Sequence, residues 1–356
     1  MEKFTSRERF KRMFEHREAD RGPIIDSPWG TTIERWRREG MPSDIDFRQY
    51  FGLDRIETIL PDCSPRELYR VIEDTPEYTV YSDRWGCVLK RLKAPGAEMP
   101  LFMHYPAKTS AEWTAMKSKM TFSRDRIPFD MLAQNYRKWR EDGCWIQAQV
   151  EVGFNVVSAF YTGIENFLIA LIEEPEWCVD MINHGLELNL MFLDAIWNEG
   201  YEFDSVLWYD DMGYKGCAFF SVDTYREFLK PAHKRLTEWA HSKGIVAHMH
   251  SCGNVMALVP EFIDLGIDGL NPLEIKAGMN PVKLKEEYGD KLLLHGGINA
   301  MLWKDIDAIE EEIEKTLPLL MQRGGYIFSS DHSVPCDVSL DNFRRIIALA
   351  KKLGSY

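Results

Sequence analysis

The sequence predicts an α/β protein that folds as one (β/α)8 TIM barrel. From about residue 145 onward, short apolar runs alternate with amphipathic helical segments, which is typical of parallel strands joined by crossover helices. No Gly-x-Gly-x-x-Gly follows any of these runs, so a doubly wound open sheet is the less favoured alternative. A chain of 356 residues suits a single barrel domain over residues 1–356.

The expected strands are short runs rich in aliphatic and aromatic residues. The first is expected at residues 23–26, which read Pro-Ile-Ile-Asp. Apolar residues recur three and four positions apart in segments 222–239 and 306–320, which predicts helices there, and Ser339 is the expected N-cap of the last helix. The later strands are expected at residues 145–150, 205–209, 245–249, 269–270, 291–295 and 326–328.

Residues from about 39 to 125 do not follow this alternation. Two β-prone segments, 78–81 and 88–90, flank the turn-forming residues 83–86, which read Asp-Arg-Trp-Gly. This pattern predicts an N-terminal insertion that contains a β-hairpin and lies over one end of the barrel.

Composition narrows the class of partner. The net charge of −13 and the pI of about 5.3 argue against a nucleic acid or an anionic membrane surface as a partner. The seven cysteines are scattered without a paired framework, which favours reduced thiols. The first residues are charged, and no apolar run approaches the roughly 20 residues of a membrane span. We therefore expect a cytoplasmic protein.

Polar residues follow most of the predicted strands. In a parallel barrel the carboxyl ends of all strands lie on one rim, where active sites form. The carboxylates of Glu151, Asp210 and Asp211 are candidates for acid–base catalysis or for orienting a metal ligand. Because adjacent strand residues point in opposite directions, we expect at most one of Asp210 and Asp211 to enter the site. The polar residues expected on this rim are Glu151, Asp210, Asp211, His250, Cys252, Asn271, His295, Asp331 and His332.

The segment His250-Ser251-Cys252 predicts part of a zinc site. Residues two apart share a strand face, and imidazole and thiolate are ligands that zinc favours. The chain has no Cys-x-x-Cys pair, so an open catalytic site with three protein ligands is expected rather than a closed structural one. The third ligand is expected to be His332, with Cys336 as the alternative. His248 shares the strand phase but lies deeper, as a packed or hydrogen-bonded core residue.

Several motifs resemble the uroporphyrinogen decarboxylase superfamily. They are Arg7-Glu8-Arg9-Phe10 followed by residues 19–23, Asp210-Asp211-Met212-Gly213, residues 225–231 and residues 325–328. The resemblance covers most of the chain. It implies a single (β/α)8 barrel with the active site in a deep cleft at the carboxyl rim, in agreement with the pattern of strands and helices.

Two segments point to a particular branch of that superfamily. The decarboxylases carry an Arg-Gln-Ala-Gly-Arg loop whose arginines bind porphyrinogen carboxylates, whereas residues 27–32 here read Ser-Pro-Trp-Gly-Thr-Thr. The motif around His250 and Cys252 resembles instead the cobalamin-dependent methyltransferases of the methylcobalamin:coenzyme M type. Those enzymes bind zinc through His-x-Cys and a later Cys, and His332 stands where that Cys would be.

The resemblance implies a zinc-dependent methyltransferase. It would move a methyl group between a corrinoid and a small thiol, folate or methoxy compound, in the last case as an O-demethylation. The corrinoid would come on a partner protein, because nothing in the chain resembles the cobalamin-binding Asp-x-His-x-x-Gly motif. Two alternatives remain open. One is a metal-free decarboxylase of a different acidic substrate with Asp210 or Asp211 as the acid, and the other is a non-catalytic barrel that binds a corrinoid or tetrapyrrole.

Overall fold

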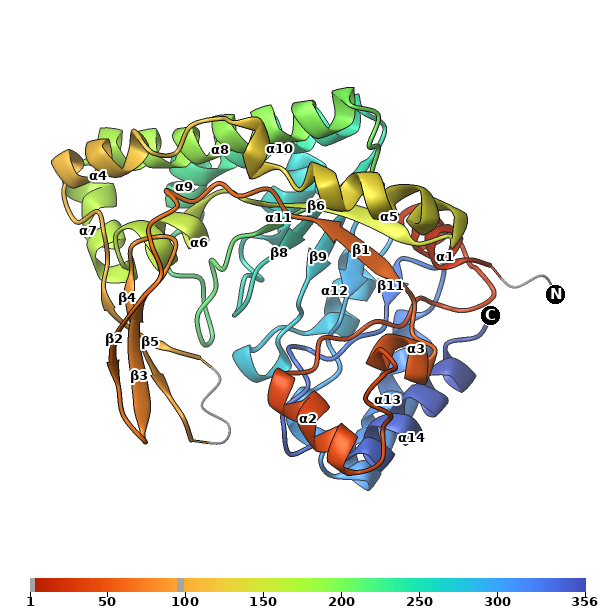
Figure 1. The fold of residues 1–356 in the computed structure, drawn as a ribbon. Coiled ribbons are helices and arrows are strands. Elements are labelled where there is room, and N and C mark those ends of the chain that lie inside the picture. The colour runs from red at the N-terminus through yellow and green to blue at the C-terminus, as the bar shows by residue number, and fades with distance from the viewer. Residues whose placement is uncertain (1–3, 95–98) are drawn as a thin grey trace.

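A curled sheet of seven parallel strands forms the centre of the molecule (Figure 1). The computed structural model describes residues 4–94 and 99–356. The strand order β1-β6-β7-β8-β9-β10-β11 follows the order of the chain, so each crossover leads to the adjacent strand, as in TIM-like folds. The strands are β1 (Ile56–Ile59), β6 (Trp145–Glu151), β7 (Ser205–Tyr209), β8 (Val246–His250), β9 (Gly269–Asn271), β10 (Leu293–His295) and β11 (Tyr326–Ile327).

The two edges of this sheet are joined through the segment around Ile24. Ile24 forms a single parallel bridge with Phe328, directly after β11. Its carbonyl oxygen accepts a hydrogen bond from the Asp54 N–H at 2.9 Å, just before β1. The strand expected at 23–26 is therefore a short hydrogen-bonded segment rather than a regular strand. The structure shows a curled half-barrel of seven strands, consistent with a TIM-like fold.

Helices cover the outer face of the sheet (Figure 1). Ser339 caps the last helix, because its side chain accepts a hydrogen bond from the Asn342 N–H, and this prediction is confirmed. Among the described residues, no single helix is long and apolar enough to cross a membrane. Within the described part of the chain, one pair of helical segments, Phe154–Tyr161 and Ile164–Glu173, meets the length and composition criteria together, and it is bent by 118°. The outer helices are α5 (Phe129–Glu141), α7 (Ile164–Glu173), α8 (Pro175–Asn198), α10 (Lys230–Ser242), α11 (Val259–Leu265), α12 (Pro281–Tyr288), α13 (Ile306–Leu320) and α14 (Leu340–Leu353).

The other helices include several of a single turn. Two single-turn π-helices, η2 and η3, extend α6 and α9, and such turns are frequent near functional sites. The remaining elements are α1 (Ser6–Phe14), α2 (Gly30–Arg38), α3 (Phe47–Phe51), α4 (Ser110–Lys117), η1 (Arg124–Arg126), α6 (Phe154–Val156), η2 (Val157–Tyr161), α9 (Val222–Thr224), η3 (Tyr225–Leu229), η4 (Ile275–Ala277) and η5 (Ala300–Leu302).

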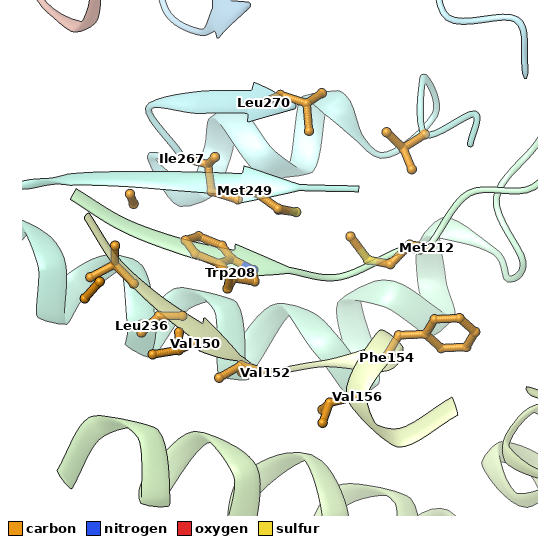
Figure 2. Close-up of a cluster of buried hydrophobic side chains, with 14 of the residues drawn as sticks. Val150, Val152, Phe154, Val156, Trp208, Met212, Leu236, Met249, Ile267 and Leu270 are labelled. Atoms are coloured by element: carbon orange, nitrogen blue, oxygen red, sulfur yellow. The ribbon is translucent and has the colours of Figure 1, made fainter. Parts of the chain in front are cut away.

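The period-two alternation of the strands separates an outer and an inner face. Val150, Trp208, Met249 and Leu270 are register partners on four neighbouring strands, and all are at most 1% exposed. Figure 2 shows them within one buried apolar cluster. Their chain neighbours therefore point toward the barrel axis. The alternation thus places apolar residues against the helices and a partly polar row inside the barrel.

A second, antiparallel sheet stands beside the barrel (Figure 1). Its hairpin β3–β4 closes where the sequence predicts it, because the Asp83 Oδ1 accepts hydrogen bonds from the N–H groups of Trp85 and Cys87 at 3.0 Å. However, β1 belongs to the parallel sheet and lies inside the range 39–125. The separate sheet is therefore shorter than the expected insertion, whose bounds are not confirmed. Its strands, in spatial order, are β2 (Arg70–Asp74), β3 (Tyr78–Ser82), β4 (Val88–Leu92) and β5 (Leu101–His104).

Candidate metal centre and active-site pocket

A pocket of about 500 Å³ extends from the carboxyl rim of the barrel into its interior. This volume lies within the range of pockets that bind small molecules. At the rim, strand ends and their following loops supply the polar wall. The residues lining this part are Tyr209, Asp211, His250, Cys252, Asn271 and His332.

His250 and Cys252 lie side by side at the rim, as their spacing predicts. β8 ends at His250, and the His250 Nε2 is 3.3 Å from the Cys252 Sγ. The other ring nitrogen, Nδ1, is hydrogen-bonded to the Asn271 Oδ1 at 2.7 Å, which fixes the orientation of the ring. Asp211 Oδ1 lies 3.6 Å from the His250 Nε2, so a carboxylate joins the pair. The three ligand atoms lie within 4.8 Å of one another.

A second group of ligand atoms shares Cys252. The ligand atoms of Cys252, Glu274 and His332 also lie within 4.8 Å of one another, with 3.8 Å between the His332 Nε2 and the Glu274 Oε1. The structure thus brings His332 beside Cys252, whereas Cys336 is not among the described residues that line the pocket. Glu274 is absent from the sequence prediction. The sequence could have indicated Glu274, because it lies three residues after the end of β9, in the loop Asn271-Pro272-Leu273-Glu274 on the same rim.

Two glycines hold the loops that carry Asp211 and Cys252 together. A side chain on Gly253, which has φ of +79°, would place its Cβ 2.2 Å from the carbonyl carbon of Gly213. A side chain on Gly213 would likewise clash with the backbone of Asn254, at 2.5 Å. This close approach lets the Asp211 Oδ1 accept a hydrogen bond from the Cys252 N–H at 2.8 Å. The loops after β7 and β8 therefore set the position of both side chains.

Asp210 and Asp211 point to opposite sides of the sheet. Asp211 lines the pocket, but Asp210 is completely buried outside it. The Asp210 Oδ1 accepts a hydrogen bond from the Asn155 N–H at 2.6 Å. Its Oδ2 lies 2.8 Å from the His233 Nε2, which is close enough for an ion pair although the two groups are not aligned as a regular hydrogen bond. The His233 Nδ1 in turn meets the Tyr225 hydroxyl at 3.0 Å.

Glu151 ends β6 at the level of Tyr209 and His250 in the sheet register. Its side chain is not among the described groups that line the pocket, and its Oε2 is buried without a hydrogen-bond partner in the described structure. Burial raises the pKa of Glu151 to about 7, while the nearby Arg84 opposes this rise and the charge of Asp211 adds to it. Glu151 can therefore take up or release a proton near neutral pH.

Burial also changes the ionisation of the rim pair. Burial, with the charge of Asp211 adding to it, raises the pKa of the Cys252 thiol well above its usual range. Burial lowers the pKa of His250, although the charge of Asp211 acts the other way. The protein alone thus favours a neutral thiol beside a neutral imidazole. A divalent cation at this position would favour the thiolate instead.

The barrel interior below the rim is also polar. His248 and His295 line the pocket with their ring centroids 5.3 Å apart. Burial lowers the pKa of His248 to about 3 and also lowers that of His295. His248 is packed edge-on against Phe14, as expected of a core residue, but its Nε2 has no hydrogen-bond partner among the described residues.

The chain belongs to the uroporphyrinogen decarboxylase family. A family model described as uroporphyrinogen decarboxylase (URO-D) matches residues 88–353, well over half of the chain. The resemblance inferred from the sequence motifs is therefore confirmed.

Individual relatives cover less of the chain. Uroporphyrinogen decarboxylase of Helicobacter pylori (strain P12) is 31% identical over 136 residues, which cover 36% of this chain and 35% of that protein. Methylcobamide:CoM methyltransferase MtaA of Methanosarcina barkeri is 34% identical over 100 residues, 27% of this chain and 28% of that protein. The chain matches only about a third of the length of these curated relatives.

A solved structure matches over the full length. A methyltransferase from Methanosarcina mazei superposes with a TM-score of 0.66 at 18% sequence identity, and the match covers 98% of this chain and 99% of that one. At this identity the likeness shows a shared fold.

Proposed function

We propose that the protein is a zinc-dependent methyltransferase that moves a methyl group between a corrinoid and a small thiol, folate or methoxy compound. The observation that carries the proposal is the set of imidazole, thiol and carboxylate groups gathered around Cys252 at the mouth of a deep pocket. This mixture of nitrogen, sulfur and oxygen donors fits zinc. Similarity to a methylcobamide:CoM methyltransferase supports the corrinoid part of the proposal.

His250, Cys252 and His332 would hold the ion, with Asp211 and Glu274 as further donors or as hydrogen-bond partners of those ligands. When bound, zinc would favour the thiolate form of a thiol substrate or polarise a methoxy oxygen. The chain's own residues orient this site. Asn271 fixes the ring of His250, and Asp211 holds the backbone of Cys252. Glu151, which titrates near neutral pH, is proposed as a nearby proton acceptor or donor.

The corrinoid would be supplied by a partner protein in the cytoplasm. The rim ligands lie at the mouth of the pocket, and His332 keeps 34% of its side chain exposed. A bulky prosthetic group on another protein could therefore approach the ion from the open side, while the small substrate occupies the pocket.

Decarboxylation of a different acidic substrate is the alternative, and the similarity to uroporphyrinogen decarboxylases favours it. The pocket offers little for a polycarboxylate, however. Arg48 is the cation among the described lining residues, and its guanidinium already contacts Asp46 at 2.9 Å. A substrate with several carboxylates would thus lack free positive partners.

Zinc analysis followed by a transfer assay tests the proposal. We expect about one zinc per purified chain, and we expect Cys252→Ala and His332→Ala to lower zinc affinity by orders of magnitude. Their melting temperatures without zinc should match that of the wild-type protein, because the ligands lie outside the barrel's apolar core. Stoichiometric zinc in Cys252→Ala would show that the site is assigned wrongly.

The transfer itself is visible in the absorption spectrum of the corrinoid. Methylcobalamin, free or protein-bound, would be mixed with zinc-loaded protein and thiols or folates, which accept its methyl group. Reduced cob(I)alamin would be mixed with zinc-loaded protein and methoxy-aromatic compounds, which donate a methyl group to its cobalt. We expect a zinc-dependent spectral change with one class and none with Cys252→Ala. Carbon dioxide release from a porphyrinogen without any corrinoid change would favour the decarboxylase instead.

A further inference from the structure

The pocket continues along the barrel axis well below the rim ligands. TIM barrels normally fill this axis with layers of bulky side chains. Here the wall residues below the rim are largely uncharged and polar, and they line an open pocket instead of filling the axis. The wall residues of this lower part, which we call the axial chamber, are Thr58, Gln147, Gln149, Leu207, His248, His295 and Ser329.

An aromatic floor closes the axial chamber. Phe10 and Phe14 of α1 pack under the first residue of β6, Trp145, and the rings of Phe14 and Trp145 are stacked at 5.5 Å. These side chains belong to a small apolar cluster that is separate from the main core. The lower end of the chamber is therefore apolar and aromatic.

Two histidines that line the axial chamber each have one buried ring nitrogen without a hydrogen-bond partner in the described residues. His248 is 5% exposed and His295 is 9% exposed. The His248 Nε2 and the His295 Nδ1 are buried without a hydrogen-bond partner in the described part of the chain. Such orphaned groups destabilise a protein unless a ligand or water satisfies them. Gly269 leaves room for this arrangement, since a Cβ there would approach the His248 ring to 3.1 Å.

The charged residues lining the pocket below the rim are already paired. Asp54 contacts Arg9 at 3.0 Å and Arg21 at 2.6 Å. Asp26 accepts hydrogen bonds from the N–H and hydroxyl of Ser330 at 3.0 and 2.7 Å. Among the described lining residues, no uncommitted charge remains for an ionic group of a ligand in the axial chamber.

We propose that the axial chamber is a binding subsite for the inner end of an uncharged, flat small molecule, whose hydroxyl or carbonyl group is hydrogen-bonded by His248 and His295. The aromatic floor supplies a surface for a ring, and a neutral imidazole can donate or accept a hydrogen bond. This substrate subsite rests on the function proposed above, and His248 and His295 would be its specificity-determining residues.

Phenol, toluene and benzoate are matched probes of this subsite. Binding would be measured by isothermal titration calorimetry on the purified full-length chain, with and without added zinc. We expect phenol to bind more tightly than toluene, which lacks the hydroxyl, and more tightly than benzoate, which carries a charge. The measurement needs no corrinoid and no bound zinc, so it can succeed even where the proposed methyl transfer fails.

Variants assign the binding to the two histidines. We expect His248→Leu and His295→Leu each to weaken phenol binding by about 3- to 10-fold, as loss of one hydrogen bond implies, and to leave toluene binding unchanged. His248→Gln and His295→Gln retain hydrogen-bonding groups and should stay within about 3-fold of the wild-type affinity. His241→Leu, a change at a half-exposed histidine paired with Asp268, is the control and should have no effect.

A crystal structure of the wild-type protein with phenol gives a second measurement that does not depend on the folding of variants. We expect the phenol hydroxyl within hydrogen-bonding distance of a ring nitrogen of His248 or His295. The proposal is overturned if phenol shows no saturable binding at about 10 mM, the range expected for so small a ligand. Unchanged phenol binding in both leucine variants, or benzoate binding as tightly as phenol, would overturn it as well.

Discussion

Two adjacent carboxylates at the end of β7 have opposite environments. Asp210 lies on the outer side of the sheet, completely buried between the Asn155 N–H and the His233 ring. Asp211 lies on the inner side, 36% of its side chain is exposed, and it contacts the backbone of Cys252. The outer network joins α6 and α10 to the strand end, while the inner contact shapes the rim of the pocket. Neighbouring residues of one type therefore lie in separate environments, one inside a buried network and one at the pocket.

The largest expected effect is on the outer side. Asp210→Ala removes the acceptor for the Asn155 N–H and the partner of His233, both inside the protein. We expect a loss of about 2–5 kcal/mol in the free energy of unfolding. Urea denaturation would measure it, with Asp211→Ala as the matched control, expected to lose less than about 1.5 kcal/mol. Equal losses for the two variants would contradict this division of roles.

Glu151 lies near both Asp210 and Asp211, whose charges help to raise its pKa. Its titration should make the stability of the protein depend on pH. Its folded pKa of about 7 is above the ordinary value of 4.5, so the folded state holds the proton more tightly between these values. Stability should therefore fall as pH rises through this window. Glu151→Gln removes the effect, and we expect it to be more stable than the wild-type protein at pH 8 by up to about 3 kcal/mol.

The comparison for Glu151→Gln uses urea denaturation of zinc-free protein at two values of pH. Near pH 4.5 the variant and the wild-type protein should differ little, because Glu151 is protonated in the folded state of the latter. A stability difference that does not change between pH 4.5 and pH 8 would show that Glu151 does not titrate in this range.

A smaller effect is expected on the inner side. Asp211→Asn should lower zinc affinity by about 10- to 100-fold, since residues that support or supplement metal ligands usually contribute this much. Competition with a chromogenic chelator measures the affinity. Asp210→Asn, which changes the adjacent carboxylate in the same way, should change zinc affinity much less. The reverse order would place Asp210 in the metal site.

The smallest effect is expected at Cys336. Its carbonyl oxygen accepts a hydrogen bond from the Arg35 Nη1 at 3.1 Å, whereas Cys336 is not among the described residues that line the pocket. Cys336→Ala should therefore keep zinc affinity within about 2-fold of the wild-type value if the thiol is no ligand. The same chelator competition measures it. A loss comparable to that of Cys252→Ala would transfer the ligand role from His332 to Cys336.

The local sequence pattern was sufficient to predict most strands of the parallel sheet. All six strands predicted from residue 145 onward agree with the observed ones within two residues at each end, and β7 matches fully, because buried strands are short apolar runs with clear flanking loops. β1 was not predicted, since Ile56-Glu57-Thr58-Ile59 is short and half polar. The segment at 23–26 was predicted as a strand but makes one bridge only, because its ladder is interrupted after Ile24.

The sequence by itself predicted that His250 and Cys252 lie side by side, from the two-residue spacing of a strand. In the structure β8 ends at His250, and the following loop keeps Cys252 beside it. The common rim of parallel strands also predicted His332 near this pair. The sequence also determined that Asp210 and Asp211 diverge, but which of them enters the pocket required the register of β7 against β6 and β8. Only the tertiary structure brought Glu274 to Cys252 and placed two orphaned histidines on the barrel axis. These groups come from strands distant in sequence, and their meeting depends on the curl of the sheet, which no local pattern encodes.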